Sequence, residues 1–62
     1  MQYTNSQLDA LISEQIHSER DRKIMRYKLI DGYTYERIAE IIGMSAIQIS
    51  RIVKRCKKLI YS

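Results

Sequence analysis

Apolar residues recur every three or four positions along most of this 62-residue chain, which is the period of helices that bury one face. Four such stretches are separated by short segments. No proline interrupts them, and both glycines lie between stretches, where helices end. The pattern favours a compact all-α fold over any sheet. It predicts a small four-helix bundle with helices at about residues 5–16, 19–31, 35–42 and 46–61.

The first two predicted helices differ in how their apolar residues are distributed. The first has a single stripe, formed by Leu8, Leu11, Ile12 and Ile16. In the second, Ile24, Met25 and Leu29 share one face, whereas Tyr27 and Ile30 point away from it. Such a helix either lies at the centre of the bundle or turns one flank to a second subunit. Its basic residues are interleaved with acids, and we expect them to be solvated: Arg20, Arg22, Lys23, Arg26 and Lys28.

The pattern is strongest on either side of Gly43. The apolar positions before it are Ile38, Ala39, Ile41 and Ile42, and those after it are Ile49, Ile52, Val53, Cys56 and Ile60. Two helices joined by only three residues must cross steeply to bring these faces together. Gly43 stands where a helix end needs a left-handed residue. Ser45, with Gln48 three positions later, predicts a capping box for the last helix. Similar caps are predicted at Thr4 with Gln7, at Ser18 and at Thr34.

The last helix has two opposite faces when its residues are placed 100° apart. One face is apolar and carries Ile49, Val53, Cys56 and Ile60, widened by Ile52 and Leu59. The other face carries Ile47, Arg51, Lys54 and Lys58, flanked by Ser50 and Arg55. We therefore expect this helix to bury its aliphatic side and to expose a basic one.

The net charge of +4 is unevenly distributed along the chain. Residues 1–43 hold six basic and seven acidic side chains, whereas residues 44–62 hold five basic side chains and no acidic one. A basic run alone is more typical of a solvated helix face. Beside a steep two-helix turn it favours a polyanionic partner.

Residues 35–54 resemble the helix-turn-helix of bacterial DNA-binding proteins. That family has a small residue within its first helix, glycine at the turn and apolar residues at set flanking positions. These places are filled here by Ala39, Gly43, Ile38, Ile42, Met44, Ile49 and Ile52. The preceding residues 18–40 look like the helix before this motif in sigma-factor region 4 and in small phage regulators. The resemblance covers about two thirds of the chain and implies a single helix-turn-helix domain over residues 1–62.

The resemblance further implies that residues 46–58 lie in the major groove of double-stranded DNA. The exposed base-reading positions would be Ser45, Ala46, Ile47, Ser50, Arg51 and Lys54. Phosphates would be bound by Lys54, Arg55, Lys57 and Lys58. Arg51 suits guanine, and Ala46 and Ile47 suit thymine methyl groups. Gln48 suits adenine unless its capping role prevents this contact. An exposed isoleucine such as Ile47 is also typical of a protein interface. Tyr35 either binds a phosphate through its hydroxyl or packs at the start of its helix.

Other chemistry has little support in the sequence. The single cysteine, Cys56, belongs to an apolar face, and the single histidine is His17, so no zinc spacing exists. No acid pair, nucleophile–base pair or phosphate-binding glycine loop is present. We therefore expect no enzyme, no metal site and no cofactor. One cysteine fits a reducing cytosol, and no apolar run reaches the length of a membrane span.

Together these features predict a cytoplasmic transcriptional regulator of bacterial or phage origin. A homodimer is expected because one helix-turn-helix binds DNA weakly, with Leu59, Ile60, Tyr61 and the flank of the second helix as candidate surfaces. The alternative is a phage-type interaction module or inhibitor that docks on RNA polymerase or a host defence complex. Contact with RNA polymerase is also compatible with DNA binding.

Overall fold

The computed structural model describes residues 3–61, and this part of the chain contains four helices and no strand. They are α1 (Asn5–Gln15), α2 (Glu19–Leu29), α3 (Tyr35–Ile42) and α4 (Ala46–Tyr61). The all-α four-helix prediction is confirmed, with two helix ends placed differently. Helix α1 ends at Gln15 because Ile16 has an extended backbone, with φ −115° and ψ 120°. Helix α2 ends at Leu29, two residues early, and the chain turns through Gly32 at a φ of 74°.

Side-chain hydrogen bonds cap the first three helices at the predicted residues. At α1, Thr4 and Gln7 form a reciprocal capping box. At α2, the Ser18 hydroxyl accepts from the backbone N–H of Asp21 at 3.4 Å. At α3, the Thr34 hydroxyl accepts from the backbone N–H of Arg37 at 3.1 Å. Each cap satisfies a donor that the first helical turn leaves unpaired, so these residues fix where the helices begin.

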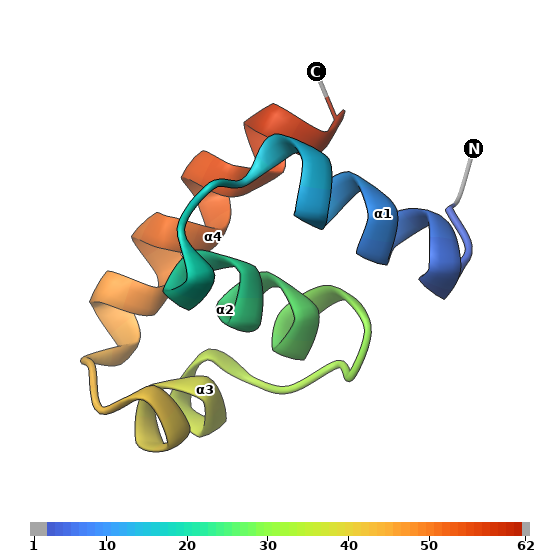
Figure 1. Cartoon of the computed structure of the whole chain (residues 1–62). Coiled ribbons are helices and arrows are strands. Elements are labelled where there is room, and N and C mark those ends of the chain that lie inside the picture. Colours follow the sequence, from blue (N-terminus) through green and yellow to red (C-terminus); the bar gives the residue numbers. More distant parts are fainter. Residues whose placement is uncertain (1–2, 62) are drawn as a thin grey trace.

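Helix α2 is the central element of the bundle. It lies between α1 and α3, while α4 runs across all three (Figure 1). Its second apolar flank is therefore largely covered within the chain, because Tyr27 and Ile30 pack partly buried against the core. The Tyr27 ring also stacks on Tyr33, with ring centroids 5.5 Å apart. The interpretation of a central helix is correct, and a second subunit is not needed to cover this flank.

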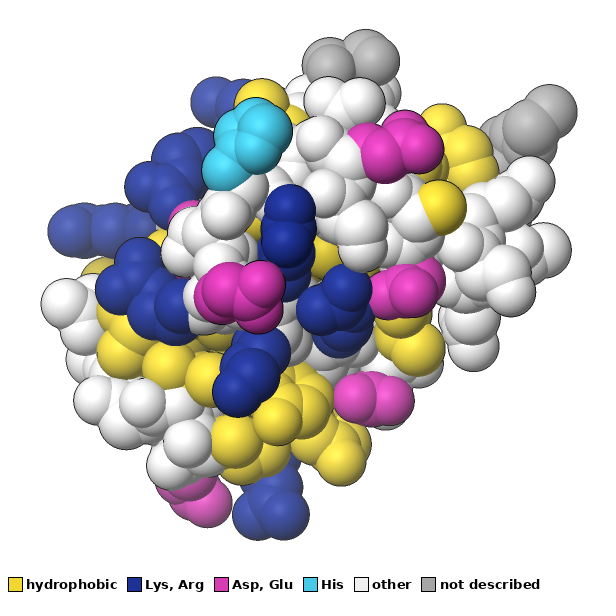
Figure 2. All heavy atoms as spheres, viewed as in Figure 1, with side chains coloured by type: hydrophobic (Ala, Val, Ile, Leu, Met, Phe, Trp, Pro, Cys, Tyr) yellow, Lys and Arg dark blue, Asp and Glu magenta, His cyan; other side chains and the backbone are white. Residues whose placement is uncertain are grey.

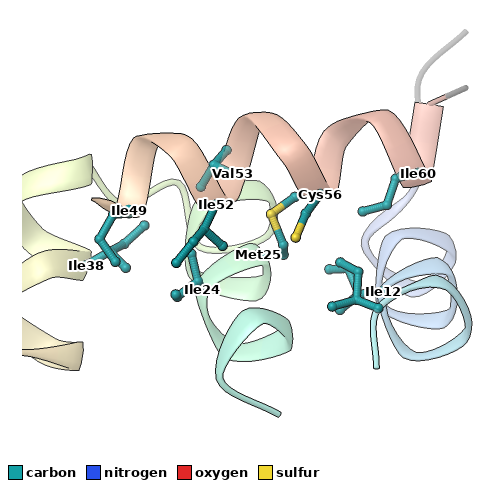
Figure 3. Packing of buried hydrophobic residues seen from close by; sticks show 10 residues of the cluster. Ile12, Ile24, Met25, Ile38, Ile49, Ile52, Val53, Cys56 and Ile60 are labelled. Carbon is teal, nitrogen blue, oxygen red and sulfur yellow. The ribbon is translucent and has the colours of Figure 1, made fainter. Parts of the chain in front are cut away.

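The core forms where the apolar face of α4 meets the other helices. Figure 3 shows the side chains of α4 pointing towards Ile12 of α1, Ile24 and Met25 of α2, and Ile38 of α3. The α4 residues in this cluster are Ile49, Ile52, Val53, Cys56 and Ile60. Since each helix contributes, α4 cannot rotate about its axis without exposing apolar side chains.

Three apolar positions differ from the sequence interpretation. Ile60 is only 5 % exposed and belongs to the core, so it cannot be part of a dimer surface. Leu59, one residue earlier and therefore rotated by 100°, is 49 % exposed and does not widen the buried face. Ile41 is 42 % exposed because the short helix α3 buries its Ile38 side.

Two arginines of α2 bind α1 and are not freely solvated as predicted. Arg22 donates to the backbone carbonyl oxygens of Ser13 and Ile16, near the end of α1. Arg26 donates to the Asp9 carboxylate at 2.7 Å and to the Ser13 hydroxyl at 3.1 Å. The Arg22 contacts satisfy carbonyl groups at the end of α1, and the contacts of both arginines hold α1 against α2.

Candidate nucleic-acid interface

The turn between α3 and α4 is built by one glycine and one capping box. Gly43 has a left-handed backbone with a φ of 83°, which an L side chain rarely adopts. The N–H groups of Gly43 and Met44 both donate to the Ala39 carbonyl, at 2.8 and 3.1 Å. The Ser45 hydroxyl then accepts from the backbone N–H of Gln48, and the Gln48 side-chain oxygen accepts from the backbone N–H of Ser45, both at 3.2 Å. The predicted turn and capping box are therefore confirmed.

This turn and the core together determine which face of α4 meets solvent. Helix α4 is continuous from Ala46 to Tyr61, and its Ile49 and Val53 side chains are fully buried. The side of α4 opposite them faces away from α1, α2 and α3 (Figure 3). An unbroken helix with one sealed side presents its opposite side as a straight row, which is the shape that fits a major groove.

Apart from Tyr35, which lies on α3, and Lys57, the residues predicted for DNA contact lie on this outer side of α4 or at its margin. Ile47 is 67 % exposed, which is unusual for isoleucine. The exposed polar and charged members are Ser45, Gln48, Arg51, Lys54, Arg55 and Lys58. Ala46 and Ser50 are half-buried at its margin. We call these nine residues, from Ser45 to Lys58, the outer face of α4.

Basic charge is less compensated on α4 than elsewhere. Within residues 3–61, Arg51, Lys54, Lys57 and Lys58 form no ion pair. By contrast, the pairs outside α4 join Arg20 to Asp21, Arg22 to Glu19, Arg26 to Asp9 and Arg37 to Glu40. Figure 2 agrees: Lys and Arg gather along the edge where Figure 1 draws α4, and they alternate with acids over α1 and α2. The uncompensated charge suits a polyanion.

Arg55 is the member of the outer face that contacts another helix. Its guanidinium donates to the Asp21 carboxylate of α2 at 2.7 Å, although its side chain is still 63 % exposed. Asp21 is only 6 % exposed and also accepts from Arg20 at 3.3 Å. No contact between Asp21 and α4 was predicted from the sequence. The signal that could have revealed the burial of Asp21 is spacing, because Asp21 precedes Ile24 and Met25 by three and four residues and so shares their buried face.

Gln48 and Tyr35 have contacts that bear on their predicted roles. The side-chain oxygen of Gln48 is used in the cap, which leaves its NH₂ group for a ligand. Tyr35 is half-buried against the core, and the Lys28 ammonium lies 4.4 Å from its ring centroid. Packing at the helix start thus occupies the Tyr35 ring, whereas a phosphate contact would use its hydroxyl.

Cys56 is buried, as the apolar periodicity predicted. Cys56 is 1 % exposed, and burial raises the pKa of its thiol above the ordinary value. The Asp21 carboxylate adds to this rise in pKa, while Arg55 opposes it. In the part of the chain that the structure describes, no group of three or more His, Cys, Asp or Glu side chains has the arrangement of a metal site.

The comparison with protein families agrees with this geometry. The model of the family described as sigma-70, region 4 matches residues 18–59, a range that contains α2, α3, the turn and all of α4 except its last two residues. The chain belongs to the sigma-70 region 4 family. Region 4 is a helix-turn-helix DNA-binding domain without a catalytic function of its own. Comparisons with curated proteins and with solved structures gave no significant match.

A helix that crosses a membrane must be both long and predominantly apolar. Over residues 3–61, no helix combines sufficient length with sufficient apolar character to cross a bilayer. The longest, α4, has 16 residues and carries its basic side chains along one face.

Proposed function

We propose that this region 4 domain binds double-stranded DNA sequence-specifically and acts as a cytoplasmic transcriptional regulator of bacterial or phage origin. Residues 46–58 of α4 would lie in the major groove. The observation that carries the proposal is the outer face of α4, where Arg51, Lys54 and Lys58, which form no ion pair within residues 3–61, lie opposite a sealed apolar side. Family membership adds the helix-turn-helix mode of binding.

Base recognition is assigned to the residues nearest the start of α4. Arg51 can donate to guanine O6 and N7 as a pair, and Ala46 and Ile47 can contact thymine methyl groups. The NH₂ group of Gln48 can donate to a base edge, while Ser45 and Ser50 offer hydroxyl groups. The large exposure of Ile47 fits this role, since contact with a methyl group would remove apolar surface from water.

Phosphate contacts are assigned to the margins of the outer face. Lys54, Arg55 and Lys58 would bind the DNA backbone and position the helix in the groove. The Tyr35 hydroxyl, at the start of α3, would bind a phosphate on the strand that this helix crosses.

The proposal is tested by fluorescence anisotropy with a labelled random duplex over a range of salt concentrations. Because each phosphate contact contributes about −0.9 to the slope of log K against log salt, three or four contacts give a slope of about −3. Selection of bound sites from a random duplex pool then tests sequence preference. Absence of binding at low salt would contradict DNA binding. A pool in which no sequence is enriched would contradict sequence specificity.

We propose that the chain binds DNA as a homodimer whose two subunits contact each other through the C-terminal end of α4. Leu59 is 49 % and Tyr61 51 % exposed, and the Tyr61 ring stacks on Tyr3 with centroids 5.8 Å apart. Two copies on a near-palindrome would supply the affinity that a single helix-turn-helix lacks. Sedimentation velocity should show a dimer that Leu59→Lys dissociates, and selected sites should be inverted repeats. A monomer bound to asymmetric sites would contradict dimerisation.

A second candidate function is docking on a protein such as RNA polymerase or a host defence complex. It is favoured by an open groove between α2 and α3, lined by Glu19, Arg20, Lys23, Ile41 and Ile42. The half-exposed Ile41 gives this groove apolar surface of the kind found in interfaces. If this were the main function, Ile41→Asp would abolish binding to the partner protein, and the chain would show no salt-dependent retention of duplex.

A further inference from the structure

One cluster joins Arg55, a predicted contact residue of α4, to Asp21 and Arg20 of α2, which were not predicted to contact DNA. The Asp21 carboxylate accepts from Arg55 of α4 through one oxygen, at 2.7 Å, and from Arg20 of α2 through the other, at 3.3 Å. The Asp21 side chain is 9 % exposed, whereas those of Arg20 and Arg55 are 54 % and 63 % exposed. A buried acid thus holds two solvent-facing guanidinium groups next to each other.

The charges of this cluster do not cancel. One carboxylate compensates one of the two guanidinium groups, which leaves a net charge of about +1 in the triad. The acid nearest to Asp21 in sequence, Glu19, is 84 % exposed and pairs with Arg22 at 3.6 Å. In the described structure Arg55 uses one of its five N–H donors on Asp21, so further donors of both arginines face solvent.

The cluster lies next to the proposed DNA-binding residues. Arg55 is four residues after Arg51 and is therefore rotated from it by only about 40° on the same helix. Arg20 also lines the groove beside Ile41 and Ile42, at the end of α3 that leads into the turn. Arg20 thus lies between the end of α3 and Arg55 of the outer face, to which Asp21 links it.

We propose that Arg20 and Arg55 form a clamp for one backbone phosphate of duplex DNA, and that Asp21 is its positioning residue. The proposal rests on the proposed DNA-binding function and extends the contact surface from α4 to α2. Two guanidinium groups fixed in advance can offer paired N–H donors to phosphate oxygens without first losing side-chain freedom. Asp21 prevents each arginine from turning away and reduces the repulsion between them.

The first test compares Arg20→Ala with Lys23→Ala, which removes the same charge from the same helix one turn later. Duplex affinity is measured over a salt series. Arg20→Ala should weaken binding by about threefold to tenfold and reduce the salt slope by about 0.9, whereas Lys23→Ala should leave the slope unchanged. Equal effects of the two variants would show a general charge effect and would overturn the clamp.

The second test uses Asp21→Asn, which raises the net charge by one from +4. A pure charge effect would strengthen DNA binding, whereas loss of positioning should weaken it by about threefold or more. Thermal melting separates a binding loss from unfolding. Stronger binding by this variant at unchanged melting temperature would overturn the positioning role of Asp21.

A third measurement does not depend on folding of a variant. On titration of the unmodified protein with duplex, the side-chain Nε–Hε resonances of Arg20 and Arg55 should shift, and those of Arg26, which is bound to Asp9, should not. Titration with inorganic phosphate should produce little change if the site requires a DNA backbone. If duplex binds but Arg20 does not respond, the clamp fails and the proposed function stands. If no duplex binds, both fail.

Discussion

At the scale of single residues, distance from the start of α4 separates the expected roles of the basic side chains. Arg51 and Lys58 lie seven residues apart on the same outer face, which is about 10 Å along the helix axis. Both are exposed, and neither forms an ion pair within residues 3–61. The earlier residue is therefore expected to meet base edges, and the later one to meet the backbone.

We predict that Arg51→Ala and Lys58→Ala weaken DNA binding in different ways. Arg51→Ala should reduce discrimination between the selected site and a scrambled duplex by about 1–3 kcal/mol, because a paired contact with guanine is lost. Lys58→Ala should weaken binding to both duplexes equally and reduce the salt slope by about 0.9. Anisotropy titrations on the two duplexes measure both quantities. Equal losses on both duplexes for both variants would contradict the assignment.

Burial controls the chemistry of Cys56. Because the folded state raises the pKa of its thiol, less thiolate is present than in an exposed cysteine at the same pH. Iodoacetamide should therefore label the native protein much more slowly than the urea-unfolded protein at about pH 8. Equal labelling rates would show that the thiol is accessible.

The raised pKa of Cys56 also has a consequence for stability. The folded thiol keeps its proton to higher pH than the unfolded one, whose pKa is about 8.5. Its stabilising contribution is therefore full below that pH and is lost as pH rises towards the folded pKa. Cys56→Ala should show a smaller decrease in stability over this range than the unmodified protein.

At the scale of elements, the end of α3 depends on one backbone conformation. Gly43 has a φ of 83°, and a Cβ atom added there would have no heavy atom within 4 Å apart from its chain neighbours. The cost of a side chain is therefore conformational and not a clash. The role of Gly43 could be predicted from sequence because a left-handed residue at a helix end depends only on its neighbours in the chain.

We predict that Gly43→Ala lowers the free energy of unfolding by about 1–2 kcal/mol, and that Gly43→Val lowers it further. Gly43→Asn is the matched control, since asparagine tolerates the left-handed conformation better than other residues with a side chain. Urea denaturation followed by circular dichroism measures the differences. An unchanged unfolding midpoint for Gly43→Val would show that the turn does not require this conformation.

Local signals predicted the elements well, and long-range contacts were the part that sequence could not supply. Caps at Thr4, Ser18, Thr34 and Ser45 involve residues three positions apart, so they are readable from sequence. The contact between Asp21 and Arg55 joins residues 34 positions apart, and no local pattern indicates such a pair. The exposure of Leu59, which the helical period placed beside the buried face, likewise depends on how α4 packs against α1.

At the scale of the whole molecule, the net positive charge is concentrated in the C-terminal third of the chain. Helices α1, α2 and α3 neutralise much of their basic charge with their own acids, whereas residues 44–62 contain five basic side chains and no acid. The free protein therefore contains repulsion within α4 that a bound polyanion would relieve.

We predict that added salt weakens DNA binding but does not destabilise the folded protein. Added salt should leave the melting temperature of the free protein unchanged or raise it, because it screens repulsion within α4, and surface ion pairs contribute little. The same salt should weaken DNA binding steeply. Melting curves and anisotropy in the same buffers test this. A clear fall in melting temperature with salt would contradict this account of the charge distribution.

The most direct test of the central claim is an amide NMR titration of the ¹⁵N-labelled protein with the selected duplex. We predict that the largest shift changes fall on the outer face of α4, from Ser45 to Lys58, with smaller changes at the start of α3. Changes confined to the groove at Ile41 and Ile42, or to the end of α4 at Leu59 and Tyr61, would contradict it.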